Sequence, residues 1–156
     1  MSNDTAELLL DREELAAWRG MLRVHAGLVR ALDAELAAMH GLPLTSYEVL
    51  LFLADAPGGR LRMAELADAV LLSRSGLTRL VDRMEREGLI RREQCPNDAR
   101  GWYAAITHTG LQTFRAARDT HLAGVRERFL THFSREELHA LAELWGRVDP
   151  GAVAER

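Results

Sequence analysis

The residues best suited to chemistry are arginines and small hydroxyl side chains clustered in residues 73–86. At helical spacing one side of this segment is apolar, with Leu77, Leu80, Val81 and Met84, and the other carries Ser75, Arg79, Asp82, Arg83 and Arg86. A guanidinium can donate two hydrogen bonds to guanine O6 and N7, and small residues at the helix start allow a close approach to base edges. The segment therefore predicts a recognition helix for the major groove of DNA. On the alternative interpretation it is a solvated charged face, whose arginines pair with Asp82 and Glu87.

The segments on either side favour DNA recognition. Residues 64–67 predict a short, tightly packed helix, and a turn at Leu71-Leu72 leads to Ser73, which we expect to cap a helix over residues 74–87. Residues 89–93 and 102–107 predict two strands joined by a turn over residues 96–101. The sequence thus predicts a helix-turn-helix followed by a β-wing, to which Arg91, Arg92 and Arg100 add positive charge.

Arg100 lies beside the predicted tip of the wing. An arginine at this position can enter the adjoining minor groove of DNA. Asp98 is two residues away, and we expect its carboxylate to hold the guanidinium of Arg100 in place. The alternative is a salt bridge within the turn that has no role in DNA binding.

Longer helices surround this central part. Apolar residues recur every three or four positions over residues 12–40, on two sides of the predicted helix, and Gly41 ends it. Further helices are predicted over residues 47–54, with Thr45 or Ser46 as cap, and over residues 63–70, 109–130 and after Ser134. Because one small lobe cannot cover the two apolar sides of the first helix, we expect a partner chain to do so.

Composition places the chain among globular proteins. It has 156 residues, 47% of them hydrophobic and 28% charged, which suits one domain. No apolar run approaches the roughly 20 residues that cross a bilayer, and Asp4 and Glu7 precede any basic residue, the reverse of a secretory signal. We therefore expect a cytoplasmic protein with no membrane partner. The net charge is −3, but residues 60–103 hold nine arginines against seven acidic residues, which favours an anionic partner there.

The order and spacing of these residues resemble the MarR family of transcriptional regulators. The resemblance covers nearly the whole chain and is carried by residues 63–67, 73–90, 91–92, 97–101, 106–107 and Gly110. It implies a mainly α fold with a small β-hairpin wing (α+β), a winged helix-turn-helix whose long helices form a dimerisation domain. Residues 1–156 would then be one domain, with a DNA-binding lobe over residues 45–107 and a helical dimerisation region over residues 8–44 and 108–150.

The resemblance also implies an activity and its residues. The activity is control of nearby genes, more often repression than activation, by a homodimer on a pseudo-palindromic double-stranded DNA operator. By position, Arg74, Ser75, Thr78 and Arg79 would contact bases, Arg83 a phosphate and Arg100 the minor groove, with Ser73 as cap and Asp98 beside Arg100. Ala99 departs from the family pattern, since many members carry a further arginine there, and this weakens the expected contact of the wing.

Family members commonly release DNA when a small aromatic anion, often a phenolic acid, binds between the dimerisation helices and the DNA-binding lobe. An aromatic platform beside a cation would suit an aromatic carboxylate. The candidate residues for such a site are Trp18, Arg19, Leu22, Arg23, His25, His40 and Tyr47. On the alternative interpretation Trp18 belongs to a dimer core, His25 is a satisfied buried histidine and Arg19 is a surface charge.

Other kinds of control and chemistry have weaker signals. The single cysteine, Cys95, excludes an intramolecular disulfide and would serve a redox-sensing repressor, but its place in the wing with no adjacent histidine favours an inert thiol. A ligand-independent winged-helix regulator is a further alternative. The six histidines lack metal-ligand spacing, and Ser73 and Ser75 are explained as cap and contact residues. We therefore expect no metal, no cofactor and no enzymatic activity.

Overall fold

The structure is a computed structural model that describes residues 9–153. Its elements in chain order are α1 (Arg12–His40), α2 (Leu44–Asp55), η1 (Pro57–Gly59), β1 (Arg60–Arg62), α3 (Met63–Ala69), α4 (Arg74–Arg86), β2 (Ile90–Cys95), β3 (Asp98–Ile106), α5 (His108–Arg128), η2 (Leu130–His132), α6 (Arg135–Val148) and η3 (Pro150–Val153). Asp4 and Glu7, on which the expectation of no secretory signal rests, lie outside the described residues, as do the ends of the predicted 1–156 domain.

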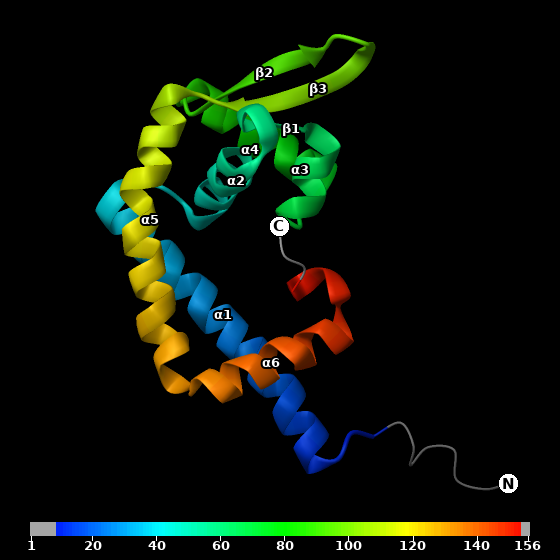
Figure 1. Cartoon of the computed structure of the whole chain (residues 1–156), viewed down its shortest axis with the longest axis vertical. Helices are drawn as coiled ribbons and strands as arrows, with labels where there is room; N and C mark the ends of the chain where they lie inside the picture. Colours follow the sequence, from blue (N-terminus) through cyan, green and yellow to red (C-terminus); the bar gives the residue numbers. More distant parts are fainter. Residues whose placement is uncertain (1–8, 154–156) are drawn as a thin grey trace, which may run out of the picture.

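Two parts of the fold are visible in Figure 1. Residues 44–106, from α2 to β3, form a small lobe that carries the β-hairpin, and we call it the winged lobe. The long helices α1 and α5 pack along each other and extend away from it, and α6 follows at the far end. The predicted fold class, mainly helical with a small β-wing, is confirmed.

The first helix has the predicted bounds. Asp11 accepts hydrogen bonds from the backbone N–H groups of Glu13 and Glu14, and Gly41 ends the helix in the left-handed conformation, with φ 60°. Of its 29 residues, only Leu32 and Leu36 are buried. Most of the apolar surface that the sequence assigned to this helix is therefore exposed in the single chain.

The sheet differs from the prediction in two respects. It has three antiparallel strands in the order β1-β3-β2, and the three-residue β1 was not predicted because so short a segment shows no alternation. The strands of the hairpin are also longer than predicted, since Gln94 pairs with Trp102 and Cys95 with Asp98 across a bulge. The bulge lets the ladder continue through residues whose types are typical of turns.

The start of α2 corrects the predicted cap. Neither Thr45 nor Ser46 caps this helix, which begins at Leu44, and the carboxylate of Asp33 on α1 accepts the Leu44 backbone N–H at 2.8 Å. Ser46 is fully buried, and its hydroxyl accepts a hydrogen bond from Nη2 of Arg83 at 3.1 Å. Both contacts join separate helices, so the sequence around the cap held no local signal for them.

The start of α5 differs in a similar way. Thr107, predicted as the last residue of a strand, is the N-cap of α5, and its hydroxyl accepts the Gly110 backbone N–H at 3.0 Å. Gly110 packs directly on the backbone of Leu89, where an added Cβ would lie 2.0 Å from the carbonyl oxygen. This close approach ties α5 to the winged lobe.

The long helices and the winged lobe meet at an aromatic cluster. The ring of Tyr47 on α2 packs against Phe114 and His121 of α5, with centroids 5.4 Å and 4.5 Å away. Nearby, Nε2 of His40 lies 2.8 Å from the hydroxyl of Thr120. Nδ1 of His121 is buried without a hydrogen-bond partner among the described residues, and burial lowers the pKa of this histidine.

Apolar side chains are exposed at the far end of the molecule. Those on α1 and α6 include Trp18, Leu22, Val24, Leu144, Trp145 and Val148, and α6 contains no buried residue. Among residues 9–153, no single helix is long and apolar enough to span a membrane. Only α1 and α2 taken together meet that measure, and they are bent by 83° where they join.

The partly buried His121, with its unpaired Nδ1, predicts a pH dependence of stability. The folded protein binds a proton at His121 less readily than the unfolded chain, in which histidine titrates near pH 6.5, so the free energy of unfolding falls as the pH drops below that value. The variant His121→Phe keeps a ring in the same space and removes the titration. We expect the melting temperature of wild type to fall more than that of the variant between about pH 7.5 and about pH 5.5. Parallel decreases would contradict this assignment.

Candidate nucleic-acid interface

The sequence of α4 sorts its side chains onto two faces as predicted. Ser73 caps the helix, and its hydroxyl accepts the Gly76 backbone N–H at 3.1 Å. The apolar face of α4 is buried in the core of the winged lobe, and its residues are Leu77, Leu80, Val81 and Met84. The opposite face exposes Ser75, Thr78, Arg79 and Arg83 to solvent. The helix thus presents a polar surface with a fixed orientation.

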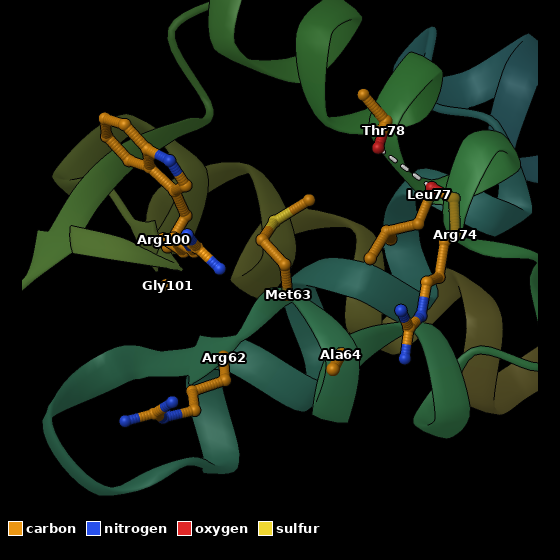
Figure 2. Close-up of a pocket in the computed structure, with 9 residues that line it drawn as sticks. Arg62, Met63, Ala64, Arg74, Leu77, Thr78, Arg100 and Gly101 are labelled. Carbon is orange, nitrogen blue, oxygen red and sulfur yellow. Dashed lines mark hydrogen bonds between the residues drawn. The ribbon is translucent and has the colours of Figure 1, made fainter. Parts of the chain in front are cut away.

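The wing and α4 enclose a hollow of about 310 Å³. Figure 2 shows three arginines around it: Arg62 from the end of β1, Arg74 from the start of α4 and Arg100 from β3. The apolar part of the wall is formed by Met63, Leu77 and Trp102. We call this hollow the wing crevice. Arg62 was not among the predicted site residues, because it belongs to the strand that the sequence did not reveal.

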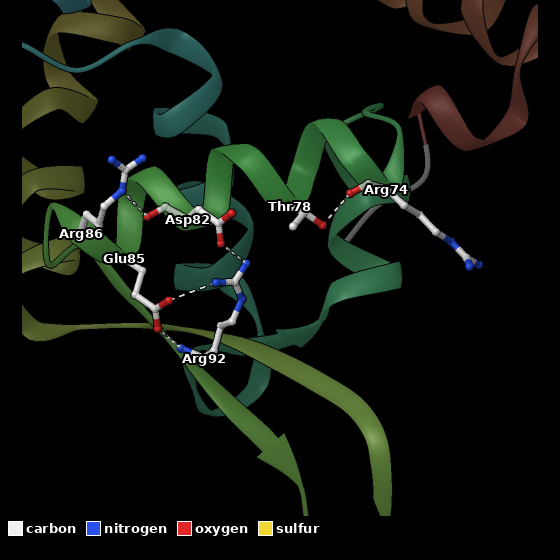
Figure 3. A network of polar contacts seen from close by, with 6 residues as sticks. All are labelled: Arg74, Thr78, Asp82, Glu85, Arg86 and Arg92. Atoms are coloured by element: carbon white, nitrogen blue, oxygen red, sulfur yellow. Dashed lines mark hydrogen bonds and ion pairs between the residues drawn. The ribbon is translucent and has the colours of Figure 1, made fainter.

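The carboxylates of α4 are already occupied. Figure 3 shows Arg92 of β2 between Asp82 and Glu85, at 2.6 Å and 3.1 Å, while the Arg92 backbone N–H donates to the other oxygen of Glu85. The side chain of Arg92 is only 23% exposed. Arg92 therefore fastens the wing to α4 and does not add free positive charge, contrary to the expectation for this residue.

Several other arginines are also engaged. Arg91 and Arg60 both pair with Glu93, at 2.8 Å and 3.1 Å, and their hydrogen bonds, with that from Arg60 first, lower the pKa of Glu93. Arg86 donates to the backbone carbonyl of Asp82. Arg83 donates to Ser46, and its Nε lies 4.0 Å from Glu87.

On α4 and the wing, three exposed arginines have neither an acidic partner among the described residues nor, like Arg86, a hydrogen bond from the guanidinium to a backbone carbonyl. Within residues 9–153, no carboxylate lies within 4 Å of the guanidinium groups of Arg74, Arg79 and Arg100. Asp82, the predicted surface partner of Arg79, is instead bound to Arg92. Uncompensated positive charge is therefore present both on the outer face of α4 and on the wing, and such charge suits a polyanion.

Asp98 does not hold the guanidinium of Arg100. Its Oδ1 accepts the backbone N–H of Arg100 at 3.0 Å, and its Oδ2 lies 3.7 Å from Nη1 of Arg62. A carboxylate two residues before an N–H favours this turn geometry, which the sequence interpretation overlooked. The predicted salt bridge between Asp98 and Arg100 is therefore wrong, and the Arg100 side chain is left free.

The candidate effector residues do not form one cluster. At a rise of about 1.5 Å per residue, Trp18 and His40 lie about 33 Å apart along α1. Trp18, Arg19 and Arg23 are exposed on the outer half of this helix. Tyr47 is buried in the aromatic cluster, and His40 contacts Thr120 beside it.

His25 is the candidate that lines a cleft between α1 and the winged lobe, with a volume of about 830 Å³. The charged residues of this cleft are Arg30, Asp33, Glu48 and Arg83, and burial raises the pKa of Glu48. Leu22 and His25 also line a mainly apolar hollow of about 440 Å³ with Met21, Val24, Leu28, Phe129 and Trp145. Arg30 and Glu48 were missed because the sequence does not reveal which turn of α1 faces the lobe.

Cys95 is buried at the end of β2, with 4% of its surface exposed. Its sulfur lies against Gly101, so close that an added Cβ there would be 3.0 Å away. Within residues 9–153, no group of three or more histidine, cysteine, aspartate or glutamate side chains could hold a metal ion.

Comparison with known proteins gives this geometry a context. A sequence profile of the MarR family matches residues 40–101. The chain is similar to the HTH-type transcriptional regulator MhqR of Bacillus subtilis, with 30% identity over 112 residues, 70% of this chain and 73% of that protein. It is also similar to the homoprotocatechuate degradative operon repressor of Escherichia coli, with 28% identity over 67% of this chain and 69% of the relative.

A solved structure matches over nearly its full length. The structure of Sco3205, a MarR family transcriptional regulator from Streptomyces coelicolor in complex with DNA, superposes with a TM-score of 0.87 and 35% identity, covering 92% of this chain and 90% of that one. The match extends beyond the winged lobe to the long helices. Together with the uncompensated arginines of α4 and the wing, these likenesses establish that the chain belongs to the MarR family of DNA-binding transcriptional regulators.

Proposed function

We propose that this protein is a homodimeric repressor that binds a pseudo-palindromic DNA operator through α4 and the wing, and that releases the operator when a small aromatic anion binds. The observation that carries the DNA-binding part is that α4 and the wing both expose arginines without acidic partners among the described residues, Arg74 and Arg79 on α4 and Arg100 on the wing. Phosphates would compensate this charge, and guanidinium groups can read base edges.

The proposed contacts are of two kinds: some read the base sequence, and others position the protein on the DNA backbone. Arg74, Ser75, Thr78 and Arg79 lie at the start of α4, the end that enters the major groove in helix-turn-helix proteins, and they read bases. Arg83 lies further along the same face and contacts a phosphate. Arg100 reaches the minor groove, where a narrow width attracts arginine. Ser73 and Asp98 shape the helix start and the turn through their backbone hydrogen bonds.

The dimer is proposed from the exposed apolar residues of α1 and α6. A face that includes Trp18, Leu22, Trp145 and Val148 is too apolar to favour contact with water. A second copy with the same face would cover it around a twofold axis. The two α4 helices would then meet half-sites about 10 base pairs apart.

The effector site is proposed at the cleft between α1 and α2, where Arg30, His25 and Arg83 offer cationic or hydrogen-bonding groups beside Val29 and Leu44. Arg83 also donates a hydrogen bond to the buried Ser46. An anion that bound Arg83 would therefore weaken the attachment of α4 to α2. One relative represses an operon for homoprotocatechuate degradation, and that compound combines an aromatic ring with a carboxylate. The buried state of Cys95 supports the alternative of a redox sensor less well.

For DNA binding, we compare an arginine that has no acidic partner with one that is already paired. Arg79→Ala should weaken binding to the operator by about 1–3 kcal/mol and relax the preference for one base in each half-site. Arg91→Ala is the matched control, because the side chain of Arg91 is also exposed to solvent but is already paired with Glu93. The measurement is a binding titration on an operator selected from random DNA by the wild-type protein. The assignment of α4 fails if Arg79→Ala binds operator and random DNA like wild type.

The second prediction concerns assembly. Trp145→Glu places a charge on the proposed interface, and we expect it to sediment as a monomer, whereas wild type sediments at twice the chain mass. Trp102→Glu is the control, since Trp102 is 45% exposed but lies on the wing, and Trp145 is 37% exposed on α6. A wild-type monomer at micromolar concentration, or a Trp145→Glu dimer, would rule out this interface.

The third prediction concerns release. Homoprotocatechuate, salicylate and protocatechuate are titrated against the protein–operator complex, and at least one of them should dissociate it. Because a charge-assisted hydrogen bond is lost, Arg30→Gln should raise the concentration needed about tenfold while leaving operator affinity unchanged. Arg19→Gln, an exposed arginine of α1 outside the cleft, should behave like wild type, and so should Cys95→Ser. Release by peroxide alone, abolished in Cys95→Ser, would show that the wrong sensor has been chosen.

A further inference from the structure

The proposed contacts of α4 and the wing with bases give no role to the wing crevice that lies between them. It lies between α4 and the hairpin, and its three arginines come from three elements, β1, α4 and β3. Figure 2 shows Arg62 and Arg100 on the side of the strands and Arg74 across from them on α4. Like charges at one hollow repel each other, and Asp98 is the acidic residue that approaches Arg62, at 3.7 Å. The hollow is therefore charged to receive an anion.

The geometry of double-stranded DNA identifies that anion. A sugar–phosphate strand separates each major groove from the adjoining minor groove. A protein that places a helix in the first and a hairpin in the second must straddle that strand. The strand then passes between α4 and the wing, across the crevice. The apolar wall of Met63, Leu77 and Trp102 offers a surface for a deoxyribose.

We propose that the wing crevice seats a backbone phosphate of the operator and that Arg62 is a DNA contact in its own right, independent of base sequence. This inference rests on the proposed binding of DNA by α4 and the wing. Arg62 is held in place before DNA arrives, because its guanidinium lies 5.7 Å from the ring centroid of Tyr103 and close to Asp98. A guanidinium fixed in this way loses little freedom when it binds a phosphate.

The neighbouring Arg60 provides a matched comparison. It lies on the same strand, and its guanidinium is 4.9 Å from the centroid of the same tyrosine ring. Arg60 pairs with Glu93 at 3.1 Å and does not line the crevice. The two arginines thus share strand, exposure and aromatic neighbour, but only Arg62 borders the path of the DNA strand.

The experiment measures how operator affinity depends on salt concentration, for wild type, Arg62→Ala, Arg62→Lys, Arg60→Ala and Asp98→Asn. Each lost phosphate contact lowers the slope of log affinity against log salt by about 0.9. With one contact in each protomer, Arg62→Ala should lower the slope by about 1.8. It should weaken operator and random DNA by the same factor, roughly tenfold per contact near 0.1 M salt. Arg62→Lys keeps the charge and should retain the slope, and Arg60→Ala should match wild type.

Asp98→Asn tests whether Arg62 acts only by fastening the wing. Asparagine keeps the oxygen that accepts the Arg100 N–H but removes the charge that faces Arg62. Because Arg62 and its charge are kept, the slope of this variant should remain above that of Arg62→Ala. The proposal is overturned if Asp98→Asn reproduces the loss seen in Arg62→Ala, or if Arg62→Ala leaves the slope unchanged while Arg79→Ala still relaxes specificity. If wild type itself binds no DNA, the proposed function fails together with this inference.

Discussion

The ion pairs of Arg92 with Asp82 and Glu85 determine how the wing and α4 are joined and which of their charged groups stay unpaired. They join β2 to α4, so the wing and the helix keep one relative orientation. They also occupy both carboxylates within α4, which would otherwise neutralise the arginines beside them. Arg79, which lies one turn before Asp82 on α4, remains uncompensated as a result. The repulsion among free cations costs stability in the isolated protein and is relieved when phosphates approach.

Three polar contacts between helices lie at or near the junction of the winged lobe with the long helices. Asp33 of α1 accepts the first N–H of α2, Arg83 of α4 donates to the buried Ser46 of α2, and His40 contacts Thr120. Two of these contacts border the cleft that we propose for the effector, through Asp33 and Arg83. A ligand can shift the orientation of the lobe only if it binds one arrangement better than the other. Contacts that α1 and α4 both make with α2 would link a ligand in the proposed cleft to the arginines of α4.

The features that could be predicted from the sequence are those with a strong local pattern. The bounds of α1 and the two faces of α4 follow from apolar spacing, and Ser73 and Ser134 from their capping positions. The features that were missed depend on contacts between distant segments. Strand β1 is three residues long and exists through its pairing with β3, which is why Arg62 was overlooked. Trp18 and Tyr47 were grouped by residue type, although about three-quarters of the 29-residue α1 lies between them.

In the proposed complex, α4 and the wing of each protomer straddle one DNA strand as a rigid pair. Hydroxyl-radical footprinting of the selected operator tests it most directly, because this reagent reports the protection of each sugar. We expect two protected half-sites about 10 base pairs apart, each with protection centred on the strand between a major groove and the adjoining minor groove. Protection confined to one groove, or limited to a single half-site, would contradict it.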